Sequence, residues 1–97
     1  MQIKIHKSYR TVVALSDTNL IGKNFESGIY QLNITESFYK GEEISKEEAV
    51  KILRKQRIED ATFNIAGHEA VKTAIEAEII SENSIGKIQD IPYALSF

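Results

Sequence analysis

The order of strand-like and helix-like patterns is the feature that most constrains the fold of this sequence. Apolar and polar residues alternate in Met1–Lys7 and Ile29–Thr35, and Thr11–Leu15 is largely β-branched, so all three segments predict strands. Only one further strand, Lys87–Ile91, is indicated, and it follows the helical segments. Doubly wound folds instead alternate strands and helices regularly. We therefore predict an α+β fold, a two-layer sandwich in which a mainly antiparallel sheet carries two helices packed on one face.

Two helices are expected between the third and fourth strands. Ser45 and Glu48 form a capping box, because the side chain of each can bond to the backbone amide of the other, so the first helix should cover Lys46–Gln56. Asn64 is placed to cap a second helix, Ile65–Ile79, whose apolar residues recur at spacings of three and four. Most of those apolar residues are small, so this helix should lie close to the sheet.

Two connecting features complete the expected fold. Residues Ser16–Asn19 can cap a short helical turn that Gly22 would end, since glycine tolerates the left-handed backbone conformation that closes helices. Pro92 lacks a backbone N–H, so it should restrict the last strand to a sheet edge or to a strand end.

Length and composition bound the class of protein. With 97 residues the chain has room for one core, so residues 1–97 should form one α+β domain. There are no cysteines for disulfides or thiol chemistry, and a formal net charge of −2 disfavours bulk coating of nucleic acid. No stretch approaches the roughly 20 apolar residues of a membrane span, and the first residues do not form a signal-peptide core. We expect a cytoplasmic protein with no membrane partner.

The sequence contains no recognisable catalytic, metal-binding or cofactor-binding pattern. His6 and His68 lie far apart, and the helical zinc motif with two histidines is absent. The five glycines are scattered, so they form neither a phosphate-binding loop nor a dinucleotide fingerprint. We therefore assign no catalytic residue, metal or cofactor, and an enzyme is the less favoured class.

The one charge feature with possible functional content is the basic end of the first helix. Lys51, Arg54, Lys55 and Arg57 could contact the phosphates of a structured RNA. The alternative, which we favour, is that these cations complement the dipole of their own helix and keep the surface soluble.

Two further groups of residues are candidates for binding. Phe38 and Tyr39 are adjacent aromatics in a loop, and they could stack on a partner, although packing against the sheet edge is the favoured interpretation. The turn that contains Asn64, Gly67 and His68 could hold a phosphate-like anion, because free amides at a helix start attract negative charge. The alternative is that Gly67 lets the helix approach the sheet closely and that His68 is a surface residue.

Three stretches of the sequence together resemble a known family. They are Leu20–Lys23 with Phe25–Gly28, then Phe38–Glu42, then Asn64–Val71, and in this order and spacing they are similar to the archaeal family catalogued as domain of unknown function 424. The resemblance implies an archaeal cytoplasmic protein with a two-layer α/β sandwich and an association with translation or RNA-processing genes. It implies no established activity. The sequence departs from the family pattern at Tyr93, where a histidine is expected, so any role of that histidine is in doubt here.

Three functional hypotheses follow from these observations. The leading one is a non-enzymatic binding module that docks on an RNA or protein assembly, with translation as its setting. The second is a small enzyme or binding protein for an anionic metabolite at the turn formed by Asn64–His68. The third is a homodimer joined through edge strands, for which the apolar residues Leu95 and Phe97 are the only sign.

Overall fold

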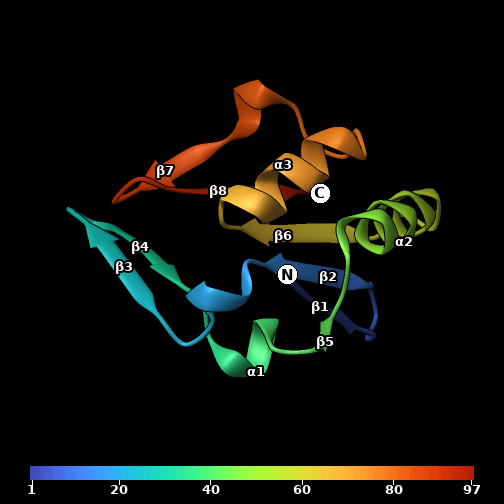
Figure 1. Cartoon of the computed structure of the whole chain (residues 1–97), viewed down its shortest axis with the longest axis horizontal. Coiled ribbons are helices and arrows are strands. Elements are labelled where there is room, and N and C mark those ends of the chain that lie inside the picture. Colours follow the sequence, from blue (N-terminus) through green and yellow to red (C-terminus); the bar gives the residue numbers. More distant parts are fainter.

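A computed structural model describes residues 1–97, and its main feature is one six-stranded sheet beside a separate two-stranded hairpin (Figure 1). The sheet has the strand order β5-β1-β2-β6-β8-β7, and β3 pairs with β4 alone. The elements are β1 (Gln2–His6), β2 (Val12–Ser16), η1 (Thr18–Leu20), β3 (Asn24–Ser27), β4 (Tyr30–Asn33), α1 (Glu36–Tyr39), β5 (Glu42–Glu43), α2 (Lys46–Ile58), β6 (Thr62–Ala66), α3 (His68–Glu76), η2 (Glu82–Ser84), β7 (Gly86–Ile88) and β8 (Ile91–Ser96).

The predicted fold class is confirmed. Four of the strand pairings in the large sheet are antiparallel, and only β2 and β6 run parallel. The chain crosses over through the hairpin, α1 and α2 before it returns as β6, and β6 therefore runs parallel to β2. This parallel pair lies at the centre of the sheet. The carboxyl ends of β2 and β6 therefore meet at the same edge of the sheet, where η1 and α3 begin.

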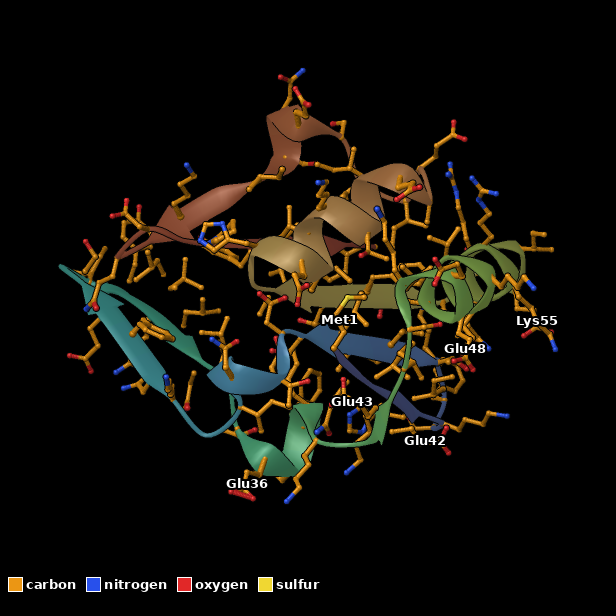
Figure 2. The ribbon with its side chains drawn as sticks, in the orientation of Figure 1. Met1, Glu36, Glu42, Glu43, Glu48 and Lys55 are labelled. Atoms are coloured by element: carbon orange, nitrogen blue, oxygen red, sulfur yellow. The ribbon has the colours of Figure 1, made fainter.

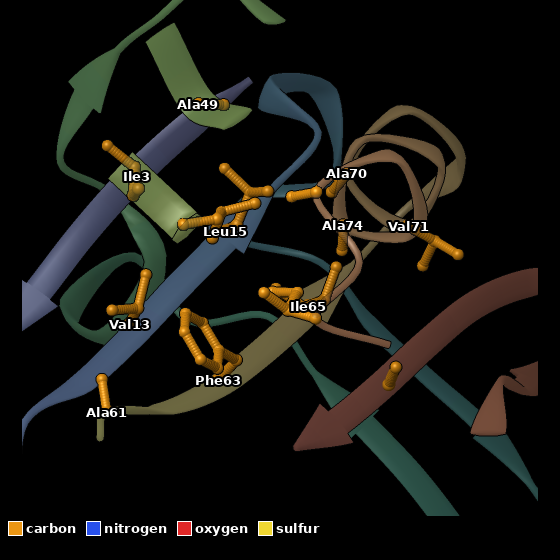
Figure 3. Packing of buried hydrophobic residues seen from close by; sticks show 14 residues of the cluster. Ile3, Val13, Leu15, Ala49, Ala61, Phe63, Ile65, Ala70, Val71 and Ala74 are labelled. Atoms are coloured by element: carbon orange, nitrogen blue, oxygen red, sulfur yellow. The ribbon is translucent and has the colours of Figure 1, made fainter. Parts of the chain in front are cut away.

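Both long helices pack on one face of the sheet, as predicted (Figure 3). Alternate residues of the strands point to this face, and small residues of α3 lie directly over β6. An apolar side chain that is fully removed from water stabilises the fold by about 1.5 to 3 kcal/mol. The buried cluster comprises Ile3, Val13, Leu15, Ala49, Leu53, Ala61, Phe63, Ile65, Ala70, Val71, Ala74, Ala77, Ile79 and Ala94.

The opposite face of the sheet is covered over only part of its area. The hairpin β3–β4, the turn η1 and the one-turn helix α1 lie on that side, and their side chains Leu20, Ile34 and Tyr39 pack with Ala14 and Ala66 of the sheet. The short helical turn expected between Ser16 and Gly22 is present as η1, whereas α1 and β3 were not predicted. The covering is thin, because it consists of a one-turn helix, a 3-10 turn and a hairpin rather than a full layer.

The start of the second long helix was predicted wrongly. Residues Ile65 and Ala66, assigned to the helix, belong to β6, and α3 covers only His68–Glu76 instead of Ile65–Ile79. Asn64 was interpreted as the helix cap, although the short segment Thr62–Ala66 alternates polar and apolar residues up to Ile65, as a strand does. The first helix is close to its prediction, since α2 ends at Ile58, two residues beyond Gln56.

The end of the chain forms a hairpin where one strand was predicted. Gln89 and Asp90 join β7 to β8 with positive φ angles of 51° and 64°, as a tight two-residue turn requires. Pro92 lies near the start of β8, which is an interior strand, and its carbonyl accepts a bond from the amide of Gly67 at 2.9 Å. Among all helices of this fold, none has the length and hydropathy that crossing a bilayer requires.

Candidate functional site

The turn before α3 lies at the carboxyl ends of the two parallel strands, and a carboxylate of the chain itself occupies it. Asp17, which directly follows β2 and is 7% exposed, accepts bonds from the backbone amides of Glu69 at 3.2 Å and Ala70 at 2.8 Å. The negative charge therefore sits where the helix dipole favours it. The sequence analysis had grouped Asp17 with the cap of η1, but its side chain makes no bond to that turn.

Gly67 is the residue that makes this contact sterically feasible. Its φ of 109° and ψ of 161° belong to a region that essentially only glycine adopts. A Cβ at this position would lie 2.3 Å from Cγ of Asp17. The glycine thus leaves space for the carboxylate that caps α3, which is a packing role.

The predicted cap by Asn64 is wrong, since Asn64 pairs with Ala14 and Leu95 inside the sheet. His68 is the first residue of α3 and is exposed. Two of the amides that the sequence analysis assigned to an external anion already donate to Asp17, so an added phosphate would have to compete with that side chain. Anion binding at Gly67 and His68 stays a prediction.

The two arginines at the basic end of α2 bond to the end of the neighbouring helix. Arg54 donates to the carbonyl of Glu76 at 3.3 Å, and Arg57 donates to the carbonyl of Glu78. Arg54 also lies 3.9 Å from the Glu78 carboxylate. These cations therefore bond to the last carbonyl of α3 and to a carbonyl just beyond it, whereas the sequence analysis had paired them with the dipole of α2 itself. Lys51 and Lys55 are exposed and form no ion pair, and Figure 2 shows Lys55 at the outer end of α2.

The adjacent aromatics Phe38 and Tyr39 occupy different environments on α1. Tyr39 is 6% exposed, and burial raises the pKa of its phenol to about 12. Phe38 is half-buried and stacks on His6 with ring centroids 4.6 Å apart, while the His6 ring nitrogen Nε2 bonds to the Phe38 carbonyl at 2.8 Å. The packing interpretation therefore describes Tyr39 fully and Phe38 in part.

A cluster of polar groups connects Met1 with β5 and η1. The amino group of Met1 lies 2.7 Å from Glu43, and the hydroxyl of Thr18 donates to the same carboxylate at 2.8 Å (Figure 2). Hydrogen bonds from the Met1 amino group and from Thr18 hold the pKa of Glu43 below its ordinary value. Each group of this cluster has a bonding partner inside the molecule.

Part of the second sheet face is open to solvent. We call Val12, Asn64, Tyr93 and Leu95 the open sheet face, because these neighbouring side chains point to that side and none is fully buried. Leu95 is 51% exposed. None of the residues that β1, β2, β6 and β8 direct to this face is acidic, although the whole chain has 14 acidic residues. The residues on this face are Gln2, Lys4, His6, Val12, Ala14, Ser16, Thr62, Asn64, Ala66, Ile91, Tyr93 and Leu95.

The ring of Tyr93 lies over the backbone of the neighbouring strand. A Cβ on Gly86, its partner in β7, would lie 2.7 Å from Cζ and 2.8 Å from Oη of Tyr93. The missing side chain at Gly86 thus provides the place where the ring rests, and the ring stays partly exposed. The sequence analysis noted Tyr93 only as a departure from the family pattern. The signal for its position is the spacing of Gly86 and Tyr93 around a two-residue turn.

Metal-binding geometry is not present in the fold, since no three His, Cys, Asp or Glu side chains are grouped to hold an ion. Asn64 and Tyr93 are brought near one another by the register of β6 and β8, whereas the lysines of α2 belong to a helix on the opposite face. The predicted candidate residues therefore do not form one site.

Comparison with known proteins places this chain in a family. The family model described as a protein of unknown function, DUF424, matches residues 5–97. No curated protein matches the chain. The chain is similar to a solved structure described as that of an uncharacterized conserved protein from Methanopyrus kandleri, with a TM-score of 0.86, 26% identity and coverage of 97% of this chain and 87% of that one. The resemblance inferred from sequence is thereby confirmed, and this protein belongs to the DUF424 family.

Proposed function

We propose that this protein is a non-enzymatic binding module that docks on single-stranded RNA through the open sheet face. One observation carries the proposal: a tyrosine ring, Tyr93, rests over Gly86 on a sheet face to which the strands β1, β2, β6 and β8 direct no carboxylate. The setting proposed for the RNA is a translation-related assembly in the cytoplasm of an archaeal cell, which rests on the family resemblance alone.

The physical support lies in how bases bind to sheets. Unpaired bases stack on aromatic side chains that a sheet presents, and each such contact contributes about 1 to 3 kcal/mol. Asn64 carries an amide with no hydrogen-bond partner in the fold, and it is a diagonal neighbour of Tyr93 across β6 and β8. Lys4 and His6 lie on the same face beside α1. The one strand carboxylate on this face, Glu43 of β5, lies at the far edge of the sheet from Tyr93 and is bonded to the Met1 amino group and to Thr18.

The basic end of α2 is a weaker candidate for the same RNA. Arg54 and Arg57 are engaged with the carbonyls of Glu76 and Glu78, so their donors are partly used within the fold. Lys51 and Lys55 would then provide most of the attraction, and they lack an adjacent aromatic side chain for base stacking. The two surfaces can be tested separately, because they lie on opposite faces of the sheet.

The test is a fluorescence anisotropy titration with a labelled oligouridylate, which has little structure of its own, and with an RNA duplex for comparison. Replacement Tyr93→Ala should weaken binding of the single strand about fivefold or more, since a stacking contact is lost. Tyr93→Phe, which keeps the ring, should bind within about twofold of the natural protein. Gly86→Ala should also weaken binding, because its methyl group displaces the ring.

The matched control is the double replacement Lys51→Glu and Lys55→Glu on α2. It should reduce binding less than Tyr93→Ala does at physiological salt. Thermal unfolding of each variant separates loss of fold from loss of contact. Equal affinity of Tyr93→Ala and the natural protein would contradict the proposal, as would binding that depends only on the two lysines.

A further inference from the structure

A cleft lies between the end of β8 and the segment that follows α3, and it adjoins the open sheet face at Leu95. Its volume is about 580 Å³, and its lining includes Ile75, Glu78, Ile79, Ile80, Leu95 and Phe97. Phe97 is 90% exposed and Leu95 is 51% exposed, and three serines, Ser81, Ser84 and Ser96, complete the lining. Exposed apolar side chains beside a cleft suit it to a partner.

The strand beside the cleft has an unpaired edge. β7 pairs with β8 only over Ile91–Tyr93, whereas β6 pairs with it over Tyr93–Ser96. The carbonyl of Pro92 accepts a bond from the amide of Gly67, so the backbone groups of Pro92 point toward β6. Backbone groups of successive residues point to opposite sides of a strand, so those of Leu95, three residues later, point away from β6. No backbone hydrogen bond outside the sheet ladders uses Leu95. Its N–H and C=O are therefore available to an added strand.

The charge of the lining favours one kind of partner. Glu78 is the only charged residue among the lining residues, and its side chain is 80% exposed, with Arg54 no nearer than 3.9 Å. Glu82 lies on the adjacent turn η2. A second copy of this chain would bring the same carboxylates together across a twofold axis, because both copies present the same surface in such an interface. A basic segment would instead complement them.

We infer that this cleft binds an extended peptide segment of another protein, which turns an apolar and a basic side chain to the cleft from the same face of the strand. The segment adds a strand beside Leu95 in the place that β7 leaves free. One apolar side chain enters the cleft over Ile79 and Ile80, and a lysine or arginine two residues along the segment meets Glu78, since alternate side chains of a strand share a face. Main-chain bonds then supply affinity and the side chains supply specificity, as in other cases of strand addition.

The test uses a capped threonine-rich peptide with a central valine and a lysine two residues further on, titrated into the labelled full chain and followed by NMR. The amides of Leu95, Ile80 and Ser84 should shift. A peptide that carries an N-methyl group at its central valine should bind at least about fivefold more weakly, because one main-chain bond is lost. The same peptide with glutamate in place of the lysine should bind still less.

Two protein variants complete the design. Glu78→Gln should reduce the preference for the lysine peptide over the glutamate peptide. Leu95→Pro removes the N–H that points away from β6 and leaves the donors that face β6, so this variant should lose peptide binding. Thermal unfolding reports whether the variant keeps its fold. If Leu95→Pro does not fold, the N-methylated peptide with the natural protein tests the same main-chain bond. Shifts elsewhere, equal affinity of the N-methylated peptide, or self-association of the chain through Leu95 without peptide would each overturn the inference.

Discussion

At the scale of single residues, Gly67 and Asp17 show how one position can determine a helix start. The carboxylate of Asp17 takes the place that the sequence suggested for an external anion, and it reaches two amides of α3. The cap comes from a strand end 50 or so residues earlier in the chain, a distance that local capping rules do not consider. Such a cap joins β2 to α3 and couples the parallel strands to the helix.

Replacement of Gly67 by alanine should lower the free energy of unfolding by about 3 kcal/mol, because strain at its φ adds to the clash with Asp17. For a chain of this length that corresponds to a fall in melting temperature of roughly 10 °C or more. The matched control is Gly28→Ala, since Gly28 also has a positive φ, of 61°, but has no atom within 4 Å of an added Cβ. It should cost about 1 kcal/mol. Equal losses for the two variants would show that Asp17 does not exclude a side chain at Gly67.

At the scale of elements, α2 and α3 are held together by polar contacts at their ends as well as by the core. Lys46 lies 2.8 Å from Glu76, and Arg54 and Arg57 donate to carbonyls at the end of α3. The sequence analysis favoured a role for these arginines at the dipole of α2, whereas the observed bonds connect them to the segment at the end of α3.

Replacement of Arg57 by alanine should reduce the free energy of unfolding by about 1 kcal/mol, because the carbonyl of Glu78 loses a charged donor. Lys51→Ala is the control, since Lys51 lies on the same helix and forms no ion pair or side-chain bond. It should change stability by less than about 0.5 kcal/mol. Chemical denaturation of the three proteins measures the difference, and identical midpoints would remove the capping role of Arg57.

The ion pair between Lys46 and Glu76 predicts a dependence of stability on pH. The hydrogen bond from Lys46 holds the pKa of Glu76 below its ordinary value of 4.5, so the unfolded chain binds a proton more readily than the folded one. The contribution of the pair is therefore complete above that pH and is lost as pH falls through the folded pKa. Glu76 likewise raises the pKa of Lys46 above 10.5, so the contribution is also lost at strongly alkaline pH.

Thermal unfolding of Glu76→Gln should thus show a deficit relative to the natural protein at about pH 7 that shrinks at about pH 3. Glu82→Gln, an exposed residue of η2 with no ion pair, should show no such change between the two pH values. A deficit of Glu76→Gln that is the same at both pH values would mean that the pair does not stabilise the fold.

At the scale of the whole molecule, the sheet has one face built for the core and one that is partly open. Sequence patterns identified the fold class, the two long helices and the first two strands, because their periodicity and the capping box are local signals. They missed β6, because its alternation is short and Asn64 was interpreted as a helix cap, and they missed the pairing of β7 with β8.

The candidate site was less accessible to sequence reasoning than the fold. The residues that now stand out are Tyr93, Gly86 and Asp17, and each matters through a neighbour from another strand or helix. Tertiary pairing decides which side chains share a face, and one sequence does not specify that pairing. Asn64 illustrates the point, because it was named as a helix cap and lies instead beside Leu95 on the open sheet face.

The most direct test of the RNA proposal is an NMR titration of the labelled protein with oligouridylate. It observes the Tyr93 ring and the Asn64 side-chain amide on one face and the backbone of Lys51 and Lys55 on the other. The account predicts that the Tyr93 and Asn64 signals move first and saturate together, with midpoints that rise as salt is added. Movement confined to Lys51 and Lys55, or no movement at Tyr93 and Asn64 at millimolar RNA, would contradict it.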